Sequence, residues 1–276
     1  DFYEENNDEV RDVGDEYHGT MMTGLLVANG TFLGAAPEVS LSVALALGPE
    51  GSSGQQDRVA MAIRWCRITQ EADIISLSLG ANPGAGMGTD SETVSAVNEA
   101  LSSGIFVVAA AGNTGLDESI YDVSVPANIP GVIAVGAVYR SGVSWPESAS
   151  GSEIDPYGGE PREFPNQKPE VSAPGVNIFS TATTELSPPY AYSSGTSDST
   201  VFVAGALSLI LELYGEELEN ENGQIDQESM ELVKRALANS AAGGESFEGG
   251  HDSKMGYGKL DASEWASQVA FELNLN

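Results

Sequence analysis

Residues 105–113 read IFVVAAAGN, an apolar run that ends in glycine and asparagine. A short apolar run without polar alternation is typical of a strand that is buried on both faces. Strands of this kind occur in parallel sheets whose two faces are covered by helices. The stretch therefore predicts an inner strand over residues 105–111, followed by a turn at Gly112 and Asn113.

Strand-like and helix-like segments alternate on either side of this run. Further strands are predicted at residues 41–47, 74–79 and 132–138, and ordered structure resumes over residues 171–179. The predicted helices lie at residues 56–70, 92–101 and 226–237 and begin near His18, Ser197 and Asp261. Thr89 and Asp261 each stand three residues before a glutamate, which is the spacing of a capping box at a helix start. This order predicts an α/β fold with a parallel β-sheet flanked by helices on both faces.

The chain shows no internal repeat and no interdomain linker, so we expect a single domain over residues 1–276. Within it we expect an acidic leading loop at residues 1–16. Residues 139–170 are rich in Gly, Pro, Ser and Glu and predict a long surface-loop region. No stretch approaches the roughly 20 apolar residues of a membrane span. The single cysteine, Cys66, excludes an intrachain disulfide.

The composition is poor in cations. The chain carries 41 Asp and Glu against 11 Lys and Arg, which is a formal net charge of −30. Clustered Lys and Arg are needed to hold phosphate groups, so this composition excludes a non-specific nucleic-acid binder and argues against docking on anionic lipid. A surface rich in acids and poor in lysine suits multimolar salt, where self-repulsion is screened. We therefore favour a halophilic source over an acidic protein of ordinary water.

Three positions carry the chemistry of acyl transfer. His18 begins an apolar helix, Ser197 begins a buried helix, and Asn113 ends the inner strand. A serine hydroxyl at a helix start lies near unpaired N–H groups and the positive end of the helix dipole, which stabilise a developing oxyanion. Taken singly, such a serine is usually an N-cap, a histidine is usually structural, and an asparagine after glycine is usually a turn residue. Together, at the edges of one α/β sheet, they predict a nucleophile, a base and an oxyanion donor.

The motifs around these positions resemble those of the subtilisin-like serine proteases, the subtilases. The resemblance rests on HGT at residues 18–20, AAAGN at 109–113, and GTS at 195–197 followed by VAG at 203–205. Supporting matches are SLSLG at 76–80, APG at 173–175 and GYGKLD at 256–261. The matches stand in the family's order and extend from near residue 15 to the C-terminus.

The resemblance implies a serine endopeptidase that hydrolyses peptide bonds through an acyl-enzyme. Ser197 would be the nucleophile and His18 the general base. Asn113 would donate to the oxyanion together with the backbone N–H of Ser197. One wall of the substrate cleft would be formed by Ser78, Leu79 and Gly80. This segment would pair with the peptide backbone as an added strand. The other wall of the primary specificity pocket would be Ala110, Ala111 and Gly112. We expect an extracellular or secreted protein.

The third member of the catalytic triad has no match. In subtilases this aspartate follows the first strand of the sheet, a few tens of residues before the histidine. Only 17 residues precede His18, and no apolar strand precedes any of the aspartates among them, Asp1, Asp8, Asp12 and Asp15. We therefore assign no catalytic aspartate and expect the chain to begin just past it, with the first strand missing. Besides the polypeptide substrate, the expected partner is an N-terminal segment or propeptide that carries the aspartate.

Two further positions depart from the family's motifs. Asp198 follows the serine where the family usually has methionine. If its charge faced the cleft, it would oppose the developing oxyanion. If it faced away, it would stabilise the N-terminus of the helix. Tyr17 precedes the histidine where the family usually has glycine, and Met21-Met22 follow where it usually has His-Val. These departures support a second hypothesis, a catalytically weak or inactive subtilase fold that acts as a structural or binding module. A third hypothesis is an esterase that uses the same residues.

Calcium is the family's usual cofactor, bound by carbonyl and carboxylate oxygens. The loop at residues 27–34 is shorter than the calcium loop that many subtilases carry there, and no other acidic stretch has a diagnostic ligand spacing. No cofactor is therefore assigned, and calcium stays open. Cys66 is predicted to be a small buried hydrophobic residue, His251 a surface-loop residue, and the acidic run 216–221 a solvated face.

Overall fold

The computed structural model describes residues 2, 12–13, 17–49, 56–83, 91–247 and 250–275. Its helices are α1 (His18–Val27), α2 (Gln56–Ile68), α3 (Glu92–Ser102), α4 (Thr196–Leu218), α5 (Gln227–Ser240) and α6 (Ala262–Glu272), with a 3-10 helix at Gly244–Ser246. Its strands are β1 (Ile74–Leu77), β2 (Phe106–Ala110), β3 (Ile133–Val138), β4 (Val171–Pro174), β5 (Val176–Thr181) and β6 (Tyr190–Ser194). The leading loop predicted at residues 1–16 lies almost entirely outside the described residues.

Strands β1 to β4 form one parallel sheet in the order β1-β2-β3-β4. Every residue of β2 and β3 is buried. This is the burial expected of inner strands that are covered on both faces, and it explains why their sequences are apolar without alternation. The predicted parallel sheet and its inner strand after Gly104 are therefore confirmed.

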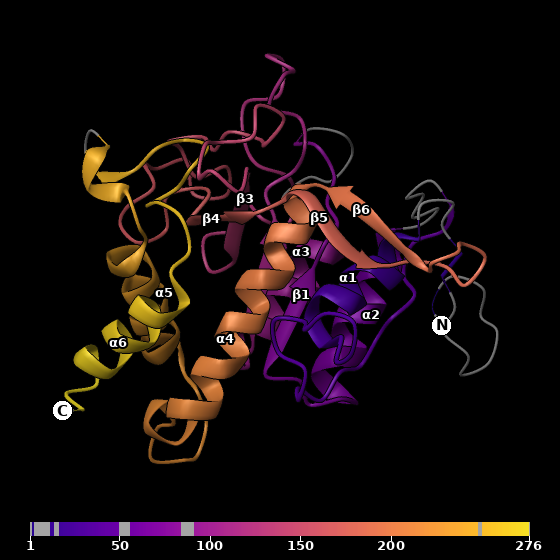
Figure 1. The fold of residues 1–276 in the computed structure, drawn as a ribbon. Coiled ribbons are helices and arrows are strands. Elements are labelled where there is room, and N and C mark those ends of the chain that lie inside the picture. The colour runs from indigo at the N-terminus through magenta and orange to yellow at the C-terminus, as the bar shows by residue number, and fades with distance from the viewer. Residues whose placement is uncertain are drawn as a thin grey trace.

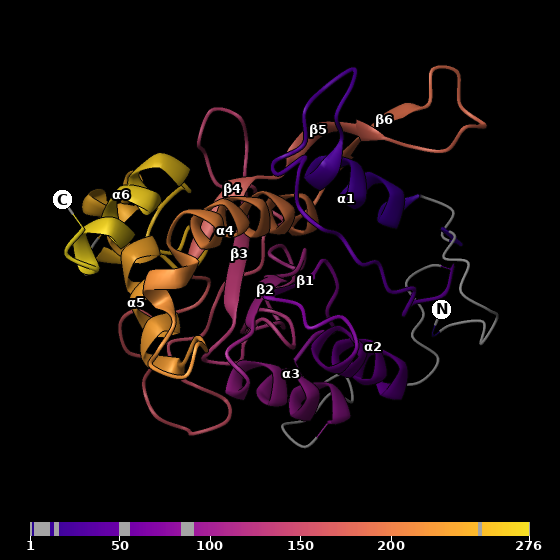
Figure 2. The same ribbon diagram turned by 90° about the horizontal axis from the view of Figure 1, so that it is seen from below.

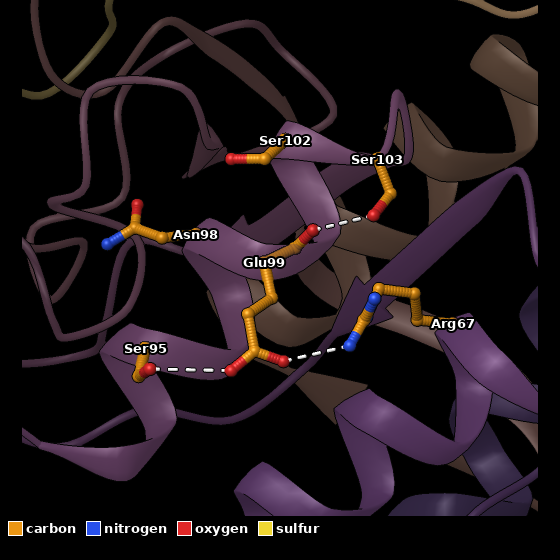
Figure 3. Close-up of a pocket in the computed structure, with 6 residues that line it drawn as sticks. All are labelled: Arg67, Ser95, Asn98, Glu99, Ser102 and Ser103. Atoms are coloured by element: carbon orange, nitrogen blue, oxygen red, sulfur yellow. Dashed lines mark hydrogen bonds and ion pairs between the residues drawn. The ribbon is translucent and has the colours of Figure 1, made fainter.

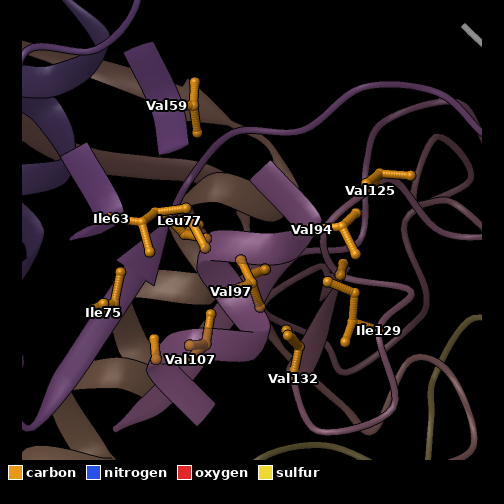
Figure 4. Close-up of a cluster of buried hydrophobic side chains, with 14 of the residues drawn as sticks. Val59, Ile63, Ile75, Leu77, Val94, Val97, Val107, Val125, Ile129 and Val132 are labelled. Carbon is orange, nitrogen blue, oxygen red and sulfur yellow. The ribbon is translucent and has the colours of Figure 1, made fainter. Parts of the chain in front are cut away.

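Helices cover both faces of this sheet. Figure 2 shows α2 and α3 on one face and α4 on the other, with α5 beside α4. On the first face, Ile63 of α2 and Val97 of α3 pack against Val107 of β2, and each is at most 1% exposed (Figure 4). The helical spacing of apolar residues seen in the sequence therefore points into this core.

The core on the other face surrounds α4. Leu207 of α4, Leu237 of α5 and Trp265 of α6 are each at most 1% exposed, and the indole N–H of Trp265 donates to the carbonyl of Val233 at 3.0 Å. Figure 1 shows α4 running along the sheet from the base of the β5–β6 hairpin. This packing holds α4 rigidly, so its first turn is a well-supported place for a reactive side chain.

Helix α1 joins the hairpin to α4. Strands β5 and β6 pair antiparallel outside the main sheet, and α1 lies between them and α4 (Figure 2). Met21 and Leu25 of α1 form a small core with Val201 of α4. A Cβ on Gly24 would come 2.1 Å from Oγ1 of Thr181 on β5. The glycine therefore permits the close approach of α1 to the hairpin.

A buried ionic cluster joins β4 to α5. One carboxylate oxygen of Glu170 accepts from the ammonium of Lys168 at 2.8 Å and from that of Lys234 at 2.9 Å, and all three side chains are at most 2% exposed. The other carboxylate oxygen accepts from the N–H of Ala134 at 2.8 Å. Burial lowers the pKa of Lys168 to about 7. Two of the four lysines of the chain are thus buried in this cluster. The surface therefore carries even fewer cations than the composition indicates.

Residues 139–170 run from β3 to β4 without a helix or a strand. Arg162 in this region pairs with Asp122 at 3.0 Å, and both side chains are 1% exposed, so the loops are anchored from within. His251 lies in a loop, as predicted, but it is less exposed than expected. Its Nε2 lies 2.9 Å from the carbonyl of Pro169 and its ring packs edge-on against Tyr257, so the histidine is half-buried.

Two predictions of local structure are wrong. Residues 41–47 form no strand, and Leu41 and Val43 are 41% and 40% exposed. A strand needs a neighbour to complete its ladder, and no described strand lies alongside this run. The N-cap of α3 is Ser91, whose hydroxyl accepts from the N–H of Val94 at 3.3 Å, and not Thr89, which lies outside the described residues. The capping-box spacing favoured Thr89, which stands three residues before Glu92, but serine is the better N-cap residue and caps the helix without that glutamate.

Candidate active site

Ser197 lies in the first turn of α4, directly after the hairpin. Its hydroxyl donates to the carbonyl of Ser78 at 3.3 Å, and the Ser78 hydroxyl donates to the carbonyl of Ser197 at 3.1 Å. The segment that follows β1 is therefore held against the start of α4. The structure brings together these two predicted site residues, which are 119 positions apart.

Asn113 stands beyond the end of β2 and is tied to the same helix start. Its side-chain oxygen accepts from the N–H of Thr196 at 3.0 Å and from the Thr196 hydroxyl at 2.9 Å. A backbone N–H can only donate, so the amide oxygen must face Thr196 and the orientation of the amide follows. The amide nitrogen then lies on the side of Gly195, 3.4 Å from where a Cβ on that glycine would stand. The role of this nitrogen as an oxyanion donor stays a prediction.

His18 is the first residue of α1, and its side chain is exposed. Val201, one turn after Ser197, packs with Met21 and Met22, which lie one turn after His18. The first turns of α1 and α4 therefore lie side by side, and the histidine stands on the helix neighbouring the serine. Its role as the general base stays a prediction.

Asp12 caps the helix that carries the histidine. Its Oδ2 accepts from the N–H of Thr20 at 2.7 Å and from the Thr20 hydroxyl at 2.8 Å. The residue in the N-cap position, Tyr17, has a left-handed backbone (φ 53°, ψ 34°) and makes no side-chain cap. A glycine would adopt this backbone without strain, which accounts for the family's usual residue there. The sequence carried no signal that Asp12 reaches this helix start.

The two predicted pocket walls contact the same serine. A Cβ on Gly80 would come 2.8 Å from Cβ of Ser124, and a Cβ on Gly112 would come 2.2 Å from its Oγ. The N–H of Ser124 donates to the carbonyl of Ala111 at 2.7 Å. Gly112 also has φ +107°, a backbone that a larger residue rarely adopts. Ser124 therefore lies between the walls, and no motif in the sequence pointed to it.

Asp198 is 2% exposed and accepts a short hydrogen bond from the hydroxyl of Ser193 on β6. The sequence left two orientations open for this carboxylate, toward the cleft or away from it. In the structure the carboxylate is directed toward the β5–β6 hairpin. Burial raises the pKa of Asp198 to about 6, against the opposing effect of the Ser193 hydrogen bond. The first turn of α4 thus carries a carboxylate that is costly to ionise.

A surface hollow lies on α3 and the adjoining end of α2, on the opposite side of the sheet from α4 (Figures 2 and 3). Glu99 in this hollow accepts from Arg64 at 2.7 Å and from Arg67 at 2.9 Å. These ion pairs link α2 to α3, and they raise the pKa of Arg64 and lower that of Glu99. The hollow contributes nothing to the site around Ser197.

Among the described residues, no three His, Cys, Asp or Glu side chains converge to hold a metal ion. In the same part of the chain, no helix is long and apolar enough to cross a membrane. Cys66 is half-buried on α2, and burial raises the pKa of its thiol.

The fold is similar to solved protease domains. The structure titled "Structure of self-cleaved protease domain of PatA" matches with a TM-score of 0.69 and 24% identity, over 92% of this chain and 83% of that chain. "Structure of Prenylagaramide maturation protease PagA" matches with a TM-score of 0.66 and 24% identity, over 92% of this chain and 82% of that chain. At this identity the likeness concerns the fold alone.

Sequence comparison identifies the family. The chain is 40% identical over 197 residues to Subtilisin E of Bacillus subtilis (strain 168), which covers 70% of this chain and 45% of that protein. It is 35% identical over 226 residues to the Major intracellular serine protease of the same strain, which covers 80% of this chain and 62% of that protein. The chain thus spans about half the length of the first of these relatives. The model of the subtilase family (Peptidase_S8) matches residues 1–258. The chain therefore belongs to the subtilase family.

Proposed function

We propose that this chain carries the catalytic machinery of a serine endopeptidase. The observation that carries the proposal is the hydrogen-bonded junction of three segments. The residue after β1, the turn after β2 and the start of α4 meet through the Ser78–Ser197 and Asn113–Thr196 hydrogen bonds. This junction supports a site in which the nucleophile Ser197 and the donor Asn113 would be held together before any substrate arrives.

The proposed reaction follows the acyl-enzyme route. Oγ of Ser197 attacks the carbonyl carbon of the scissile bond while His18 takes its proton. The oxyanion of the tetrahedral intermediate accepts from the side-chain amide of Asn113 and from the N–H of Ser197. His18 then gives the proton to the leaving amine as the C–N bond breaks, and a water molecule releases the acyl group by the same steps. The Ser197–Ser78 hydrogen bond is long for two oxygens, so the hydroxyl can leave it at little cost.

The substrate would bind as an extended peptide along Ser78, Leu79 and Gly80, and its side chain would enter between this segment and Ala110–Gly112. Ser124 lies between the two walls, which supports a shallow pocket that takes small side chains. Substituting Ser124→Gly should shift the preference toward larger residues in a peptide library. An unchanged preference would remove Ser124 from the pocket.

The carboxylate of the triad would come from a strand-forming segment outside residues 1–276. Two observations support this proposal. In the described sheet β1 has a partner on one edge only. The apolar run at 41–47 pairs with no described strand, although the N–H of Phe2 donates to the carbonyl of Leu45 at 2.8 Å. A further parallel strand beside β1 would occupy that open edge. The aspartate at its end would then reach the side of the sheet where His18 lies.

The test compares the 276-residue chain with a chain that begins upstream, each with and without Ser197→Ala, on an unfolded protein and on an ester substrate in high salt. We expect Ser197-dependent proteolysis by the longer chain. In serine proteases the change of the triad aspartate lowers turnover about 10⁴-fold, and we expect a loss of that order in the short chain. Equal rates would place the acid within residues 1–17, with Asp12 the first candidate. Absence of Ser197-dependent proteolysis from both would favour the inactive module, and cleavage of the ester alone would favour the esterase.

A halophilic origin and secretion are further proposals. The net charge of −30 supports the first, and its test is the salt dependence given in the Discussion. Family membership does not decide the compartment, since one matched relative is named an intracellular protease. Fractionation of the source culture tests secretion directly, and recovery of the protein in the cell lysate alone would contradict it.

A further inference from the structure

We propose that Asp198 is a positioning residue for Ser197, which couples the end of β6 to the nucleophile's helix turn through its carboxylate. The inference rests on the proposed function, since it concerns the same serine. In contrast to the nucleophile, base and oxyanion donor, Asp198 is not part of the family's usual motif, so its role has to come from this chain's own contacts.

The carboxylate connects two elements at the point where they meet. Its Oδ1 accepts from the hydroxyl of Ser193, the residue that pairs with Ile178 in the hairpin. Its Oδ2 lies 3.6 Å from where a Cβ on Gly195 would stand, on the glycine that also faces the amide nitrogen of Asn113. Gly195 itself makes no side-chain cap for α4. The side chain of Asp198 therefore ties the hairpin to the turn carrying Ser197.

The energetics of this carboxylate indicate a functional role. Asp198 is 2% exposed, and the ion pairs of the described residues do not include it. The folded protein holds its proton up to about pH 6, whereas an unfolded chain releases it near pH 4, so ionisation lowers the stability of the fold as pH rises through this window. An uncharged residue of the same shape would avoid that cost. A destabilising group retained beside a reactive atom is typical of functional sites.

Among the described residues, few other titratable groups belong to the elements around Asp198. At this end of α4, strands β1, β2, β3 and β4 carry none. Helix α1 carries His18, with Asp12 at its start, and β6 carries Tyr190 and Tyr192. Below neutral pH the acid limb of activity should therefore reflect two groups, the histidine base and Asp198. If both groups must lose a proton for activity, log kcat would fall with a slope of two as pH decreases, whereas a single group would give a slope of one.

The experiment measures kcat and KM between pH 4.5 and 8 for the active form of the chain, for Asp198→Asn and for Ser193→Ala. Asp226→Asn is the matched control, because Asp226 is also an acid at a helix start and caps α5 away from the site. We expect kcat to fall about ten- to a hundred-fold at pH 7.5 in the two site variants, as for a small displacement of a reacting group. KM should change little, and the control should match the parent.

Three readouts separate positioning from a merely structural role. The Tm of Asp198→Asn should be unchanged or higher at pH 7.5, because a buried charge is removed. On the acid side, the plot of log kcat against pH should have a slope of one for Asp198→Asn and a slope of two for the parent. The double variant should lose no more than either single variant, since Ser193→Ala removes the hydrogen bond and Asp198→Asn replaces its charged acceptor by a neutral amide oxygen, so both changes act on the same contact.

The result that overturns the inference is Ser197-dependent activity in the parent with an unchanged kcat and slope in Asp198→Asn. A lower kcat that is accompanied by a lower Tm would also overturn it, because the residue would then act through stability alone. If the parent itself shows no Ser197-dependent hydrolysis, the proposed function fails instead, and the Ser197→Ala baseline distinguishes the two cases.

Discussion

Asn113 has two functions that substitution can separate. Its side-chain oxygen anchors Thr196, and its nitrogen is the proposed oxyanion donor. Substituting Asn113→Ala removes both. Thr196 is 1% exposed, so its N–H would be left buried without an acceptor, which costs about 1–3 kcal/mol of the free energy of unfolding. Loss of the donor should lower kcat about 10²–10³-fold, a magnitude measured in subtilisin itself.

Substituting Thr196→Val is the comparison that isolates the anchor. It removes the hydroxyl that accepts from the N–H of Gly112 at 3.1 Å and donates to Asn113, but it keeps the amide nitrogen and the backbone hydrogen bond. We expect a loss of stability of about 1 kcal/mol, since the N–H of Gly112 loses its acceptor. The loss in kcat should stay below about tenfold, because the donor remains.

The assay measures kcat and KM on a fluorogenic peptide in high salt, and denaturant unfolding of the same samples gives stability. The decisive quantity is the ratio of the two kcat values, because both variants weaken the same junction and only Asn113→Ala removes the donor. A kcat for Asn113→Ala within tenfold of that for Thr196→Val would refute the reasoning. Asn113 would then hold the helix start without taking part in the chemistry.

Three further predictions follow from buried charge, net charge and backbone strain. Lowering the salt from 1 M to 0.1 M lengthens the Debye length from about 3 Å to about 10 Å, so the Tm should fall as the acidic surface repels itself; a constant Tm would contradict halophily. Glu170→Gln leaves Lys168 and Lys234 buried without their carboxylate and should cost about 3–5 kcal/mol in denaturant unfolding; a loss below 1 kcal/mol would mean that other oxygens satisfy both ammonium groups. Tyr17→Gly relieves the left-handed backbone and should raise stability by about 1 kcal/mol; lower stability would show that the tyrosine side chain contributes more by its contacts than its backbone costs.

Much of the fold could be read from local pattern. The apolar runs that became β2 and β3, the inward faces of α2 and α3, and the cap of α6 by Asp261 were predicted because each depends on residues near in sequence. The run at residues 41–47 was predicted wrongly for the opposite reason. Its apolar pattern suits a strand, but a strand exists only when another strand lies beside it.

The sequence by itself determined the fold class, the subtilase resemblance and the candidates Ser197, His18 and Asn113, because short motifs encode helix starts and strand ends. Only the tertiary structure decided which distant groups meet. It placed Ser124 between Gly80 and Gly112, and the carboxylate of Asp12 on Thr20. It also turned Asp198 toward Ser193 and away from solvent. These contacts join segments by burial and hydrogen bonding across the fold, and neither spacing nor composition carries that information.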